Sequence, residues 1–279
     1  MKSAAALRRE LDLWAASGRR LQMWWRDDGA RTPSKPLDRL LATARRYETP
    51  LALAVIPDMD RSLLAARLAC ERQVVVIQNG VDGQKVDLAA TPQADFPLRY
   101  PREAMETRLV EGREGLDVMP RFAAVFVPRR NAVHPDLAQA LSACGYRGLS
   151  ALGQDLASAQ GLTRIDVHLD LMEGPAGAGF TGGEPFMARF LKLARDRRRA
   201  GDWDQPIGVL THHLDQDEAA WRFLDDFLDR TTGSLAVRWR SINDLISGER
   251  DQRVIGPAPA PRSATPTAPL RLGDVRLSR

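Results

Sequence analysis

Short, continuously apolar runs recur along this chain and constrain its fold more than any other feature. Each run is closed by proline, by polar residues and glycine, or by threonine and histidines. The clearest runs are residues 51–56, 74–77, 123–127 and 207–210. Segments with apolar residues at helical spacing alternate with them, as at Leu37, Leu40 and Leu41. Continuous apolar runs of this length are typical of parallel strands buried on both faces, and their alternation with helices predicts an α/β fold.

The length of the chain fits one domain of this kind. It has 279 residues, and α/β barrels commonly occupy about 200 to 250 residues as one unit. Polar and ionisable residues gather where the apolar runs stop, which favours a barrel with its site at one rim. Residues 257–269 are rich in Pro and Ala and have no apolar face, a composition typical of extended or disordered segments. We therefore expect a barrel domain over residues 1–250 and a disordered tail over 251–279.

Charge and hydropathy exclude several other classes of protein. The formal net charge is +4, and the one basic run, residues 195–199, follows a predicted helix. Cations near a helix C-terminus are favourable, so this run is interpreted as a solvated helix end and a nucleic-acid partner is not expected. Residues 1–20 are charged and amphipathic, without the apolar core of a secretory signal, and no run has the length of a membrane span. We expect a cytoplasmic protein that does not bind membranes.

Two adjacent carboxylates, Asp27 and Asp28, end an apolar run and are followed at once by Gly29. Glycine allows a sharp turn, so the pair is expected at the C-terminal edge of a strand, where α/β enzymes keep their chemistry. Side chains alternate along a strand, but a turn at the edge can bring both carboxylates toward one pocket. One could then hold a metal ion while the other takes a proton from its bound water. The structural alternative is a salt bridge of Asp27 with Arg26 or Arg31, with Asp28 capping the next helix.

These motifs resemble those of the polysaccharide deacetylases (carbohydrate esterase family four), and most of all a bacterial cytoplasmic branch. The resemblance covers roughly residues 11–248 and implies an irregular (β/α) barrel of about seven strands. The Asp-Asp-Gly motif implies that Asp27 is the catalytic base and Asp28 a metal ligand. The family's closing Leu-x-His motif falls on residues 210–212 and implies that His212 protonates the leaving amine. A histidine pair such as His212 and His213 can also serve only to bond backbone carbonyls.

Two weaker motifs complete the site that the resemblance implies. One is the strand that ends at Pro128, whose following loop walls the site and carries Arg130 where the family has aromatic or small residues. The other is a polar strand end with His168 and Asp170, after which Gly174 replaces the tryptophan that is usual in the branch. The residues expected to contact substrate are Trp25, Pro128, Arg130, His168, Asp170 and His213.

The metal-binding motif departs most from the family, which uses two histidines four residues apart on the loop after the third strand. These positions fall on Asn79 and Gly83, so both imidazoles are missing. Asp28 remains, and Asp82 could join it and Asn79 in an oxygen-only set. Such a set suits magnesium, calcium or manganese better than zinc, whose catalytic sites normally use three imidazole, thiolate or carboxylate ligands. We expect zinc to bind weakly or not at all, with another divalent metal as an open alternative.

Two functions follow from these motifs. The first is a polysaccharide deacetylase-like hydrolase that removes acetyl groups from N-acetylated sugars by metal-assisted amide hydrolysis, and Asp27, Asp28 and His212 favour it. The alternative is a non-catalytic relative that has lost its metal site and binds a carbohydrate or a protein partner, and Asn79 and Gly83 favour it. The hydrolase would act on an N-acetylated sugar or oligosaccharide.

Overall fold

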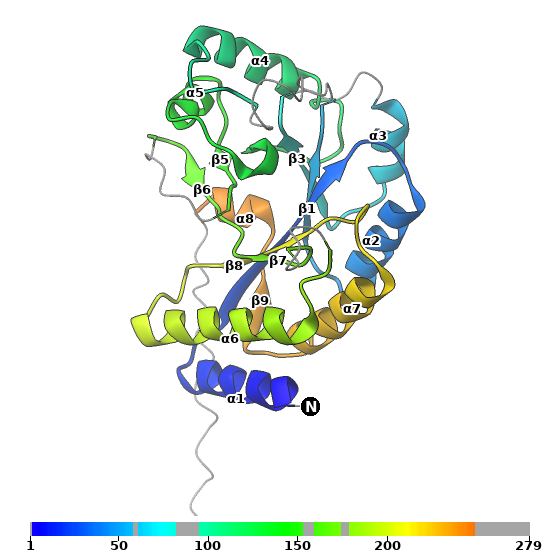
Figure 1. Cartoon of the computed structure of the whole chain (residues 1–279), viewed down its shortest axis with the longest axis vertical. Coiled ribbons are helices and arrows are strands. Elements are labelled where there is room, and N and C mark those ends of the chain that lie inside the picture. The colour runs from blue at the N-terminus through cyan, green and yellow to red at the C-terminus, as the bar shows by residue number, and fades with distance from the viewer. Residues whose placement is uncertain (1, 58–60, 82–94, 153–158, 174–178, 249–279) are drawn as a thin grey trace, which may run out of the picture.

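Every strand in the described part of the chain joins one parallel sheet (Figure 1). The computed structural model describes residues 2–57, 61–81, 95–152, 159–173 and 179–248. The longer strands are β1 (Leu21–Ala30), β2 (Leu51–Val55), β3 (Val74–Asn79), β4 (Phe122–Val127) and β8 (Ile207–Thr211). The short strands are β5 (Gly148–Leu149), β6 (Thr163–Arg164), β7 (Leu169–Asp170) and β9 (Val237–Trp239).

The sheet curls into an open, irregular half-barrel. Its strands run in the order β6-β5-β4-β3-β2-β1-β8-β7, and β9 pairs with the beginning of β1. The four apolar runs of the sequence become β2, β3, β4 and β8, which confirms the predicted α/β barrel fold. Nine strands are described where about seven were expected, because four of them have only two or three residues.

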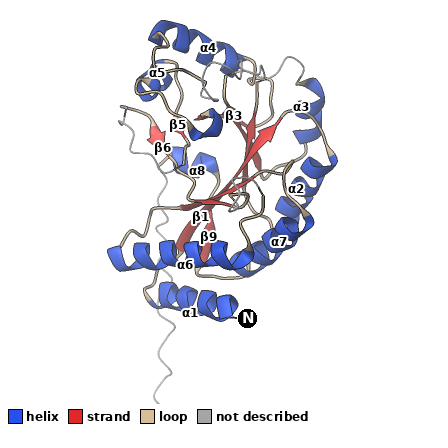
Figure 2. Ribbon diagram, viewed as in Figure 1, coloured by secondary structure: helices blue, strands red, loops and turns tan. Residues whose placement is uncertain are grey.

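Helices follow most strands and surround the sheet (Figure 2). They are α1 (Lys2–Ala16), α2 (Lys35–Arg46), α3 (Ser62–Leu68), α4 (Arg102–Glu114), α5 (Leu137–Ala143), α6 (Gly183–Ala200), α7 (Glu218–Thr232) and α8 (Ile242–Ile246), with a single 3-10 turn, η1 (Arg129–Asn131). The beginning of α2 is fixed by a local hydrogen bond: the Ser34 side chain accepts the N–H of Leu37 at 3.2 Å, which caps the first turn of the helix. None of the helices in these ranges combines the length and apolar character needed to cross a bilayer.

Side chains alternate between two separate cores along the central strands. Trp25, Leu53 and Val209 face outward and join the apolar sides of α1, α2, α6 and α7. Trp24 and Leu210 face inward and pack within the curl of the sheet, which α8 also contacts. Strand geometry requires this alternation, and it decides which polar residues share a face at the strand ends. The tail expected over 251–279 lies outside the described residues.

Candidate active site

β1 carries the two adjacent aspartates to the C-terminal edge of the sheet and stays regular as far as Asp28. Its pairing with β2 is in unbroken register up to that residue and shifts only beyond it. Gly29 has a φ of 91° and lies inside β1, where the register shifts between Asp28 and Ala30, so the freedom of glycine serves this irregularity and not the predicted sharp turn out of the sheet. Because side chains alternate, Asp27 shares the outer face with Trp25, and Asp28 shares the inner face with Arg26. The two carboxylates therefore leave β1 on opposite faces, although the charges of both act on His212.

Asp27 is completely buried and joins β1 to the residues that follow β8. Its Oδ1 lies 2.5 Å from His213 Nδ1, and its Oδ2 accepts the Thr211 hydroxyl at 2.6 Å and the His213 N–H at 3.1 Å. The Asp27 and His213 side chains are 0% and 1% exposed. Trp25 Nε1 donates to the Thr211 hydroxyl at 2.9 Å from within the outer core. This network anchors two strand ends, and it leaves the Asp27 carboxylate and the Trp25 ring without a surface toward solvent.

His212 and Asp170 form a partly exposed pair at the same edge. His212 Nε2 lies 3.3 Å from Asp170 Oδ2, and the two side chains are 28% and 17% exposed. Asp170 is oriented by the N–H of Met172, which donates to its Oδ1 at 2.8 Å. Burial lowers the pKa of His212, but the hydrogen bond and charge of Asp170, with the charges of Asp28 and Asp27, outweigh burial and raise it to about 9. The imidazole is therefore a cation at neutral pH.

Arg26 binds both oxygens of Asp28 on the inner face. Arg26 Nε lies 2.9 Å from Asp28 Oδ1, and Nη2 donates to Oδ2 at 3.0 Å. The same guanidinium donates to the Ser150 hydroxyl and carbonyl and to the Asn131 side-chain oxygen. Burial raises the pKa of Asp28, although the charges of Arg26 and His212 oppose that shift. The sequence suggested Arg26 only as a salt-bridge partner of Asp27, whereas its partner is Asp28, and it indicated no role for Asn131 or Ser150.

Two of the expected metal ligands fall at or beyond the end of β3. Asn79 is the last residue of β3, is 9% exposed, and donates from Nδ2 to the Val127 carbonyl at 3.4 Å. Asp82 lies outside the described residues. Hence only Asp28 and Asn79 of the three expected ligands lie within the described residues.

Asp95 is a buried carboxylate that sequence reasoning missed. Its Oδ2 accepts the N–H of Arg129 at 2.7 Å and its Oδ1 accepts the N–H of Val81 at 3.3 Å. Burial raises the pKa of Asp95, with the Arg129 N–H and charge opposing the shift. A Cβ on Gly80 would meet Asp95 Oδ1 at 2.7 Å, so glycine is needed there. Asp95 ties the segment after β3 to η1, and no motif in the sequence marks it.

The structure separates His168 from the other predicted site residues. His168 Nδ1 accepts the N–H of Gly208, near the start of β8, at 3.0 Å, and Nε2 lies 2.9 Å from Arg197 Nη2 of α6. Burial and the Arg197 charge lower the pKa of His168 to about 4, so the ring is neutral. Pro128 is buried at the start of η1. Arg130 belongs to η1, but its side chain lies outside what the structure describes.

The residues in place do not fit a zinc ion. Within the described ranges, no three His, Cys, Asp or Glu side chains gather closely enough to hold a metal. Both oxygens of Asp28 are engaged by Arg26, and Asn79 offers only a neutral amide oxygen. Zinc in catalytic sites requires three protein ligands, mainly imidazole, thiolate or carboxylate.

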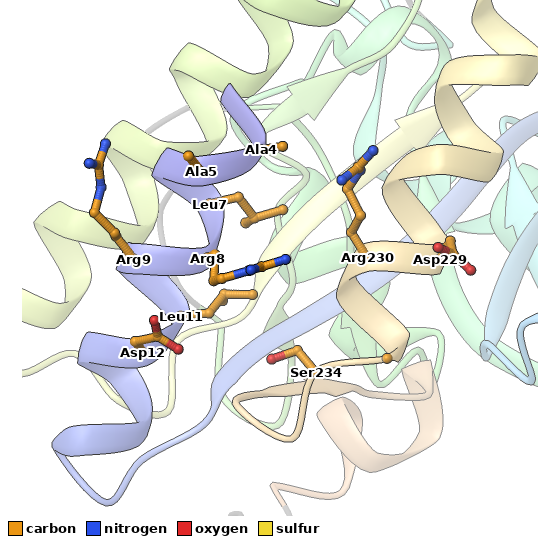
Figure 3. A pocket seen from close by; sticks show the side chains of 11 residues that line it. Ala4, Ala5, Leu7, Arg8, Arg9, Leu11, Asp12, Asp229, Arg230 and Ser234 are labelled. Atoms are coloured by element: carbon orange, nitrogen blue, oxygen red, sulfur yellow. The ribbon is translucent and has the colours of Figure 1, made fainter. Parts of the chain in front are cut away.

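A hollow of about 760 Å³ lies elsewhere, between α1 and the end of α7 (Figure 3). Its lining combines Leu7 and Leu11 with Arg8, Arg9 and Arg230. Because α1 precedes β1 and the end of α7 precedes β9, the hollow is at the N-terminal side of the sheet. It contains none of the predicted site residues, so the site is defined by the strand ends and not by this hollow.

Comparison with solved structures supports the fold. A protein from Mycobacterium smegmatis assigned as a polysaccharide deacetylase superposes with a TM-score of 0.57 at 15% identity, over 84% of this chain and 81% of its own. A Pseudomonas aeruginosa PAO1 protein of the same assignment gives 0.57 at 12% identity, over 83% and 91%. The chain has the polysaccharide deacetylase fold. PuuE allantoinase shares this fold, with a TM-score of 0.54 at 13% identity over 82% and 90% of the two chains.

Sequence comparison adds nothing to this result. No protein-family model matches the chain, and no curated protein matches it. Identities of 12% to 15% show the deacetylase fold alone, because one fold serves more than one substrate.

Proposed function

We propose that this deacetylase-fold protein binds an N-acetylated sugar or short oligosaccharide at the C-terminal edge of its sheet without hydrolysing it through zinc. The observation that carries the proposal is the engagement of both Asp28 oxygens by Arg26. A carboxylate held by a charged hydrogen bond to one oxygen and a close ion pair to the other is a poor metal ligand, because a metal ion must first displace the guanidinium. Without zinc, bound water keeps its ordinary pKa and is a weak nucleophile at neutral pH.

The binding part of the proposal rests on His212 and Asp170. A protonated imidazole beside a carboxylate offers a charged donor and a charged acceptor within 3.3 Å of each other, and both are partly exposed. Sugar hydroxyls donate and accept hydrogen bonds, and an acetamide adds a carbonyl acceptor and an N–H donor. Charged hydrogen-bonding partners of this kind contribute about 1.5 to 3 kcal/mol each. The names of two structural neighbours, which refer to polysaccharide deacetylation, support this class of ligand.

The second candidate is an active hydrolase, and the His212–Asp170 pair is also the observation that favours it. A histidine with a pKa of about 9 is protonated at neutral pH and can give its proton to a leaving amine. Asp27 would be the base, as the resemblance implies. In that role Asp27 must release one of its contacts with His213 or Thr211 to reach a water molecule.

Calorimetric titration with N,N′-diacetylchitobiose, alongside an assay for released acetate, separates the two candidates. We expect saturable binding, at least about tenfold weaker in His212→Ala because a charged hydrogen bond is lost, and no acetate release with or without added zinc. His134→Ala is the matched control, because His134 is buried and contacts Leu98 and Asp136, not Asp170.

Two results would count against the proposal. Zinc-dependent acetate release that His212→Ala abolishes would establish the hydrolase. Absence of saturable binding to acetylated oligosaccharides of two to six sugars would remove the sugar as ligand.

A further inference from the structure

The guanidinium of Arg26 is fully buried at the strand edge. Its side chain is 0% exposed, and arginine stays charged in proteins. Removing such an ion from water carries a penalty of several kcal/mol unless hydrogen bonds and an opposite charge compensate for it. A buried, permanent positive charge at the end of β1 therefore requires a built set of partners.

Those partners are oxygens from three separate segments of the chain. Asp28 on β1 supplies two carboxylate oxygens, at 2.9 Å from Nε and 3.0 Å from Nη2. Ser150, after β5, accepts from Nη1 through its hydroxyl at 2.7 Å and its carbonyl at 3.1 Å. Asn131, at the end of η1, accepts from Nη2 through its side-chain oxygen at 3.2 Å. The Asn131 backbone has a φ of 56°, a conformation that asparagine adopts more readily than most residues.

The chemistry of this shell is that of a hard cation site. Carboxylate, amide carbonyl, hydroxyl and backbone carbonyl oxygens are the ligands that calcium and magnesium take in proteins. Here the enclosed positive charge is an arginine side chain. The guanidinium also links the ends of β1, β4 and β5, as a bound ion would.

We propose that Arg26 is the resident cation of this strand edge: it neutralises Asp28, cross-links three strand ends, and keeps divalent metal ions out. Arg26 is a positioning residue, since it acts through Asp28, Asn131 and Ser150. The inference uses the same edge as the proposed sugar binding but not its ligand, so a failed sugar titration leaves it standing.

Thermal unfolding with and without 5 mM Mn²⁺, repeated with Mg²⁺ and Zn²⁺, tests this assignment. We expect the Tm of the wild-type protein to be unchanged by these ions. Arg26→Ala should lower Tm in metal-free buffer, because Asp28 loses its counter-charge. Mn²⁺ should then raise the Tm of Arg26→Ala by about 2 to 4 °C, as a ligand that binds only the folded state does. A residue with a merely structural role would give no metal-dependent shift.

Arg39→Ala is the matched control, because Arg39 also pairs with a carboxylate, Glu218, but on the surface. Its Tm should not respond to Mn²⁺. Arg26→Gln is the second variant, for use if Arg26→Ala fails to fold. Its amide oxygen would complete the oxygen shell.

Three results would overturn the inference. The first is a metal-dependent rise in the Tm of the wild-type protein. The second is a stable Arg26→Ala or Arg26→Gln variant without a metal response. The third is failure of both variants to fold even in 5 mM Mn²⁺, because the ion should supply the missing charge.

Discussion

Asp27 and Asp28 are neighbours in the chain, yet they lie on opposite faces of β1 and have different partners. On the outer face Asp27 is sealed by His213 and Thr211. On the inner face Asp28 is paired with the buried Arg26 and lies near the partly exposed His212. The difference shows that one face uses its carboxylate to join two strands, while the other assembles charges where a ligand can reach them.

Removal of the outer-face carboxylate should have the largest effect. We expect Asp27→Ala to lower the free energy of unfolding by about 3 to 5 kcal/mol, the usual loss when a buried, paired charge is deleted. Urea denaturation measures this change. Asp38→Ala, which removes an exposed partner of Arg67, should change stability little. If Asp27→Ala costs less than the Asp38 control, the outer-face network is not an anchor.

On the inner face, the charge of Asp170 should control the pKa of His212. Asp170→Asn removes the nearest negative charge and should lower the pKa of His212 by roughly 1 to 3 units, the usual effect of one close opposite charge. NMR titration of the His212 ring protons measures the shift from about 9. An unchanged pKa of His212 in Asp170→Asn would contradict the assignment.

The His212–Asp170 pair should also make the stability of the folded protein depend on pH. The pKa of His212 is raised in the folded protein, so folding takes up a proton and its stabilisation is complete below the unfolded value of about 6.5. This contribution should decline as pH rises from 6.5 through about 9. Urea midpoints should therefore fall over that window in the wild-type protein and fall less in Asp170→Asn. An equal pH response in the two proteins would refute the assignment.

The smallest effect, on zinc affinity, is expected from restoring only the two histidines of the family's metal-binding motif. Asn79→His combined with Gly83→His should raise zinc affinity, but by less than the same pair in an Arg26→Ala background, because Arg26 still holds Asp28. Zinc titration with a competing chelator compares the two proteins. Equal affinities in both backgrounds would mean that Arg26 does not obstruct the metal.

The strands, and the edge of the sheet at which they end, could be predicted from the sequence. The apolar runs, the residues that close them and Gly29 are local features that the sequence shows directly. The separation of Asp27 and Asp28 onto opposite faces could not be predicted, since it depends on β1 pairing with β2 through Asp28 and on to Ala30 instead of turning at Gly29. The contact of His168 with Arg197, and that of Asp95 with Arg129, join residues 29 and 34 positions apart. Such pairings depend on packing between elements and leave no periodic signal.

Several predicted roles stay predictions. These are the substrate contacts of Trp25, Pro128, Arg130, His168, Asp170 and His213, and the domain limits at residue 250. The same holds for the catalytic roles of Asp27 and His212, for cytoplasmic location, and for the absence of nucleic-acid and membrane partners.

Metal content tests the central claim most directly. Protein purified without chelator, incubated with excess zinc and desalted, should contain far less than one zinc ion per chain by elemental analysis, because Arg26 engages Asp28 and no imidazole stands at residues 79 and 83. One tightly held zinc ion per chain that survives chelator treatment would contradict the account.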